Sequence, residues 1–78
     1  MGLSKEERIN RGLEARRIVG HELFQEVLQT VKDAQVTRWE ESTDEAVHRE
    51  CWAVRRAISE VEDGLKAIIN DGEVAASR

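Results

Sequence analysis

The sequence predicts an all-α protein, an antiparallel helical hairpin with an N-terminal helical arm, whose core is completed by oligomerisation. The 78 residues include no proline, five glycines and three aromatic side chains, so they lack the turn residues and ring packing of a small β-sandwich or barrel. Apolar residues recur at three- and four-residue steps, which is the helical period. A chain of this length buries only about 60% of the surface of its unfolded form. We therefore expect a single domain, residues 1–78, with a thin core.

The first predicted helix is an arm over residues 5–19. Ser4-Lys5-Glu6-Glu7 fits a capping box, in which the Ser4 hydroxyl accepts from the Glu7 N–H and the Glu7 carboxylate accepts from the Ser4 N–H. Gly12 weakens the middle of this helix by about 1 kcal/mol relative to alanine. Gly20 predicts a joint at residues 18–21, after which His21 starts the next helix.

The middle helix is predicted over residues 22–41 from an apolar stripe at helical spacing. The stripe consists of Leu23, Phe24, Val27, Leu28, Val31 and Ala34, with Trp39 at its edge. A second capping box, Ser42-Thr43-Asp44-Glu45, predicts a turn and a new helix. Because this connection is so short, the helices on either side of it must be antiparallel neighbours.

The last helix, predicted over residues 44–70, has the strongest pattern, a heptad seam that packs against a partner helix. The seam consists of Val47, Cys51, Val54, Ile58, Val61, Leu65 and Ile68. Asn70-Asp71-Gly72 predicts the stop, with Gly72 in the left-handed position beyond the helix end, and residues 73–78 are expected to form a loose tail. The last helix is longer than the middle one, and we expect the arm to cover its overhang near residues 65–69.

Self-association is predicted because a lone hairpin has too little core. Cys51 is the single cysteine, so no internal disulfide can stabilise the chain, and small domains without such links usually need a partner. Trp52 and Ile69 lie off the seam and have no place inside the hairpin. They are the candidates for an oligomer or partner surface.

No group of residues predicts an enzyme or a bound cofactor. Glu45 and His48 have the i, i+3 spacing used by di-iron carboxylate bundles, but they flank the seam. We therefore predict no metal site, with these two as the nearest candidates, and expect Glu45 to favour the helix start and His48 to be solvated. Cys51, with His48 within reach as a base, has the elements of a nucleophile, yet its place on the seam predicts a buried core thiol.

The charge of the chain is divided between a basic arm and an acidic hairpin. Residues 1–20 hold five basic and three acidic side chains, whereas the whole chain has a net charge of -4. Four arginines of the arm are candidates for contacts with phosphates or an acidic partner: Arg8, Arg11, Arg16 and Arg17. The alternative is that they pair, within the chain or between chains, with Glu22, Glu26, Glu60, Glu62 or Asp63.

Several segments of the sequence resemble small helical proteins of tailed bacteriophages and prophages, from gene clusters for virion structure and DNA packaging. The likeness lies in residues 11–19, in residues 21–27, in Trp39 before a Ser/Thr/Asp turn, in Arg49-Glu50-Cys51-Trp52 and in residues 71–76. It implies a viral assembly or packaging accessory, and it carries over no catalytic residue.

The resulting prediction is a non-enzymatic protein-interaction component that binds itself through its helix seams and, in addition, another phage or assembly protein. One alternative is a nucleic-acid-binding accessory that uses the basic arm, and a second is a small metal-binding bundle. The N-terminus becomes charged at Lys5 with no apolar run before it, so we expect no export signal and no membrane anchor. The protein is predicted to be in the cytoplasm of the bacterial host where it is made, and in the virion if it stays with the particle.

Overall fold

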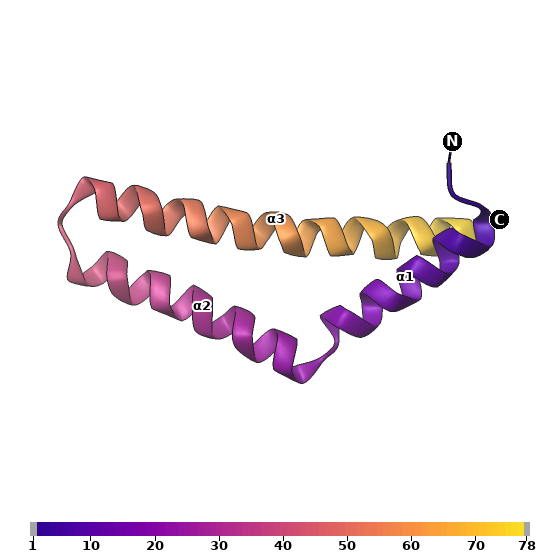
Figure 1. Ribbon diagram of the computed structural model, residues 1–78, viewed down its shortest axis with the longest axis horizontal. Coiled ribbons are helices and arrows are strands. Elements are labelled where there is room, and N and C mark those ends of the chain that lie inside the picture. The colour runs from indigo at the N-terminus through magenta and orange to yellow at the C-terminus, as the bar shows by residue number, and fades with distance from the viewer. Residues whose placement is uncertain (1, 78) are drawn as a thin grey trace.

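The computed structural model describes residues 2–77 as three α-helices, which confirms the all-α prediction. They are α1 (Lys5–Val19), α2 (Glu22–Glu41) and α3 (Glu45–Ala76). In Figure 1, α3 forms one long side of the molecule. Helix α1 starts beside the C-terminal end of α3 and runs away from it to the joint, and α2 then runs from the joint to the turn, coming closer to α3 along the way. The described residues include no strand. The molecule measures 52 × 27 × 16 Å, so it is long and flat.

The ends of α1 are as the sequence predicts. The Ser4 hydroxyl accepts from the Glu7 N–H at 3.1 Å, and the Glu7 carboxylate accepts from the Ser4 N–H at 3.4 Å, which completes the capping box. The joint is confirmed, because Gly20 closes α1 by donating to the Arg16 carbonyl at 3.0 Å. His21 then caps α2, its Nδ1 accepting from the Leu23 N–H at 3.2 Å.

The turn between α2 and α3 differs in detail from the predicted second capping box. Asp44, not Ser42, is the N-cap of α3, since its carboxylate accepts from the Ala46 N–H at 2.9 Å. Ser42 follows the end of α2, and its hydroxyl accepts from the Asp44 N–H at 3.1 Å. Both residue types can cap a helix, and with Asp44 in that role Ser42 can support the turn instead. Helix α3 therefore begins at Glu45.

The predicted stop at Gly72 and the loose tail at 73–78 are wrong, because α3 continues through Ala76. Gly72 is buried and no glycine has a positive φ among the described residues. Gly72 and Ala75 continue the heptad spacing beyond Ile68 by steps of four and three, and Ala75 is only 1% exposed. The seam thus extends for one more heptad, and α1 packs on it. Of the predicted tail, Arg78 lies outside the described residues.

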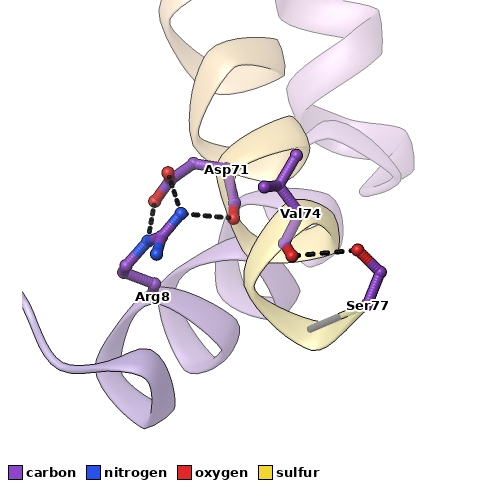
Figure 2. A network of polar contacts seen from close by, with 4 residues as sticks. All are labelled: Arg8, Asp71, Val74 and Ser77. Atoms are coloured by element: carbon purple, nitrogen blue, oxygen red, sulfur yellow. Dashed lines mark hydrogen bonds and ion pairs between the residues drawn. The ribbon is translucent and has the colours of Figure 1, made fainter.

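The α1–α3 crossing is the most closely packed part of the fold, and it covers the overhang of α3 as predicted. Gly12 and Gly72 face one another there, and a Cβ added to Gly12 would lie 3.0 Å from the Gly72 Cα. Such proximity needs residues without side chains. Beside it, the Arg8 guanidinium donates to the two carboxylate oxygens of Asp71 at 2.7 and 3.0 Å, while the Ser77 hydroxyl donates to the Val74 carbonyl at 3.0 Å (Figure 2).

The seam of α3 is confirmed at most positions and wrong at one. Cys51 and Ile58 are buried, and four of the other five seam residues are half-buried: Val47, Val54, Leu65 and Ile68. Val61 is instead 53% exposed. Near this position Lys32 of α2 pairs with Glu62 at 3.1 Å, so Glu62 takes the place facing α2. Val61 is left uncovered on the other side of the seam, because α2 moves away from α3 with distance from the turn.

Only part of the predicted α2 stripe faces α3. Phe24, Leu28 and Val31 are half-buried, whereas Leu23 and Val27 are exposed. The buried position that follows them at the same spacing is occupied by Gln35, whose side-chain oxygen has no hydrogen-bond partner. Since α2 moves away from α3 with distance from the turn, it covers a narrower strip than the sequence pattern suggests (Figure 1).

Candidate interaction surface

A groove of about 520 Å³ lies between α2 and α3, near the turn that joins them. We call it the tryptophan groove; its lining residues are Val36, Trp39, Glu40, Trp52, Arg55, Arg56 and Ser59. The side chains of Trp39 and Trp52 are 44% and 57% exposed. Two large aromatic residues in one open groove are typical of an interaction surface.

His48 fixes one wall of the groove. Its ring stacks on Trp39, with 4.0 Å between ring centroids and an interplanar angle of 6°. His48 Nε2 lies 2.6 Å from the Ser42 carbonyl oxygen and 3.1 Å from that of Trp39. Both partners are acceptors, so Nε2 carries a hydrogen and donates it. The expectation of a solvated His48 is therefore wrong: the ring joins α3 to the end of α2.

The geometry offers little to a metal ion or to nucleophilic catalysis. His48 Nε2 is engaged with backbone carbonyls, and Glu45 is exposed at the first turn of α3, as expected of a residue that favours a helix start. Within residues 2–77, no three or more His, Cys, Asp or Glu side chains lie together where they could hold a metal. The predicted burial of Cys51 is confirmed, with an exposure of 0%.

Arginines surround Trp52 on the outer side of α3. Arg49 precedes it by three residues, and Arg55 and Arg56 follow it by three and four, so all share its helix face. The Arg56 guanidinium lies 5.3 Å from the Trp52 ring centroid, within cation–π range, and also pairs with Glu60 at 3.4 Å. Arg49 and Arg55 form no ion pair within residues 2–77. The three- and four-residue spacing around Trp52 was the sequence signal for this cluster.

Three of the four arm arginines are used inside the chain. Arg8 pairs with Asp71, Arg16 with Glu73, and Arg17 with Glu14. None of these partners is among the five acidic residues expected. Asp71 and Glu73 lie where a helix stop and a tail were predicted, and Glu14 lies on α1 itself. The hydrogen bond from Arg8 holds the pKa of Asp71 below its ordinary value; desolvation opposes this effect, and the charges of Arg8 and Arg11 add to the lowering.

Ile69, the second predicted surface residue, has a place within the chain. It is half-buried and lines a small hollow at the α1–α3 crossing together with Ile9 and Leu13. The arm therefore covers much of Ile69, whereas Trp52 stays open. The cover of Ile69 agrees with the expectation that the arm lies over residues 65–69, whereas no element was expected to cover Trp52.

Comparison of the chain with models of protein families, with curated proteins and with solved structures finds no match. None of the helices, as far as the described residues extend, is long and apolar enough to cross a membrane. The arguments below therefore start from the geometry of this chain alone.

Proposed function

We propose that this protein is a non-enzymatic interaction component that associates with itself, and the extent of its exposed surface is the observation that carries this proposal. Its accessible surface is 6044 Å², whereas a compact monomer of 8.9 kDa exposes about 4,800 Å². Its radius of gyration is 16.6 Å, against about 11.5 Å for a compact domain of this length. The chain leaves surface open that a self-contained domain would bury.

The interior supports the same proposal. The buried apolar residues of the described chain are Ala15, Cys51, Ile58 and Ala75, of which only Ile58 is large. The ion pairs between helices have exposed or half-buried side chains, and pairs open to solvent contribute at most about 1 kcal/mol each. A chain with so little core is typical of a subunit that is stabilised by its partner.

The tryptophan groove suits a second, different protein partner. Tryptophan and arginine are enriched among the residues that dominate binding energy at interfaces, and Trp52 has both kinds beside it. The resemblance of the sequence to small helical phage proteins suggests the setting, a virion or its packaging machinery. In this proposal the protein is an assembly accessory that forms oligomers and presents the groove to another component.

Nucleic-acid binding by the arm has less support. Arg8, Arg16 and Arg17 already face carboxylates, so few free cations remain on α1 to neutralise phosphates. The charge pattern of the folded chain therefore favours the pairing of these arginines within the chain.

Solution mass tests the proposal directly. Light scattering and thermal unfolding, each measured over about a hundredfold range of protein concentration, should give a mass above one chain and a melting temperature that rises with concentration. A mass of one chain with a constant melting temperature would contradict self-association. Salt-sensitive DNA retention that is lost when the four arm arginines are changed would favour the nucleic-acid alternative instead.

A further inference from the structure

We infer that a second copy of this chain binds to the side of the α2–α3 pair that faces away from the tryptophan groove. We call this side the apolar flank; it consists of Leu23, Val27 and Ala34 on α2 and of Val54, Ala57, Val61 and Ile68 on α3. The inference rests on the proposed self-association and identifies the surface that makes it.

Helix geometry separates the flank from the groove. The buried side of α2 is marked by Leu28 and Gln35, and successive residues turn by about 100°. Val36 then projects to one side of that line, where it lines the tryptophan groove, and Val27 projects to the other. On α3, the line through Cys51 and Ile58 likewise has Trp52 on the groove side and Val61 on the opposite side.

The flank is apolar and open. Leu23, Val27 and Val61 are 59%, 54% and 53% exposed. At the end near the turn the flank is bounded by the Arg38–Glu50 ion pair, whose atoms are 3.1 Å apart, and at the other end by Asp71. Between these limits the helical positions on this side carry no charge. An uncharged centre with a charged rim is the composition of a protein interface.

The excess exposed surface of the chain is large enough for a contact with a second copy. The chain exposes about 1,200 Å² more than a compact monomer of its mass, and a standard interface covers about 800 Å² on each partner. One such contact would cover most of this additional exposed surface. Because the flank offers apolar side chains and no charge to be matched, an identical apolar surface complements it, as in obligate homodimers. A two-fold arrangement would bury both flanks at once.

The tryptophan groove, unlike the flank, has charged side chains in its lining. They include Arg55, Arg56 and Glu40, so a second copy placed there would have to desolvate these charges, which a contact between two apolar flanks does not require. The charges thus favour the flank for identical chains.

Four glutamate variants test the inference. On each of α2 and α3, one variant changes the flank and one changes the groove side as its control. Val27→Glu and Val61→Glu change the flank, while Val36→Glu and Trp52→Glu are the controls on the groove side. The flank variants should raise the dissociation constant of the oligomer at least about tenfold by light scattering, because each buries a charge in an apolar contact. The groove variants should keep the mass of the unchanged protein.

The outcomes distinguish this inference from the proposed function. If the unchanged protein has the mass of one chain, self-association itself is contradicted. If the unchanged protein is oligomeric, and the groove variants dissociate while the flank variants do not, the flank is the wrong surface.

Crosslinking covers the case in which the glutamate variants fail to fold. Val27→Cys and Val61→Cys, treated with a short bismaleimide, should give a covalent two-chain product, whereas Val36→Cys should not. The natural Cys51 is 0% exposed and stays out of the reaction in the folded protein. Equal crosslinking of all three variants, or crosslinking of Val36→Cys alone, would overturn the inference.

Discussion

Gly12→Ala should destabilise the protein, although alanine is the better helix former. The added Cβ would lie 3.0 Å from the Gly72 Cα and 3.3 Å from the Ile68 carbonyl oxygen. Both neighbours are backbone atoms, so they can move only if α1 and α3 separate. Overpacking of this kind costs about 1–3 kcal/mol, against a gain of about 1 kcal/mol in helix propensity. The net expectation is a loss of up to about 2 kcal/mol in the free energy of unfolding.

Gly64→Ala is the matched control, because a Cβ added to Gly64 of α3 meets nothing within 4 Å. It should keep the helix-propensity gain without the steric cost, so the two variants should differ by about 1–3 kcal/mol. Urea denaturation followed by circular dichroism, at one protein concentration, measures this difference. Equal stability of the two variants would refute the close glycine crossing.

Three further changes test the charges and the core. Arg8 holds the pKa of Asp71 below its ordinary value of 3.8, mainly by hydrogen bonding, so the pair's stabilisation is present above that pH and is lost as pH falls through the lowered pKa. The melting temperature of Asp71→Asn should therefore fall less as the pH is lowered than that of the unchanged protein. An equal fall in the two proteins would contradict this. Ile58→Ala, at a position 9% exposed on the seam, should cost about 2–4 kcal/mol, and an unchanged melting temperature would remove the argument for the seam. Thiol reagents should label Cys51 slowly until denaturant is added, whereas rapid labelling of the folded protein would place the thiol outside the core.

The helix starts and the joint could be predicted because local chemistry decides them. Ser4 with Glu7, and Gly20 with His21, act within a few residues, and no distant contact opposes them. Gly72 is the opposite case. Its local signal was a helix stop, but a glycine also allows two helices to approach closely, and here that use prevails. The continued heptad spacing through Gly72 and Ala75 was the evidence for it.

The surface was less predictable than the core for a related reason. Trp52 and Ile69 both lie off the seam, yet only Ile69 is covered, because the arm reaches it. Similarly, the apolar pattern could not reveal that Val61 is exposed, since this depends on the angle between α2 and α3. His48 was expected to be solvated because its partners, Trp39 and the Ser42 carbonyl, come together only in the folded turn.

The distribution of residue sizes gives a final reason to expect dependence on a partner. The α1–α3 crossing buries residues with little or no side chain, since Gly12 and Gly72 approach closely there and the other buried residues of these helix ends are Ala15 and Ala75. Since hydrophobic stabilisation grows with apolar area, by about 25 cal/mol per Å², this crossing fixes the geometry of the arm more than it stabilises the chain. Several large apolar residues that are open to solvent, such as Leu23 and Trp52, lie outside it. Most of the stabilisation still available to the protein is therefore on surfaces that only another chain can cover.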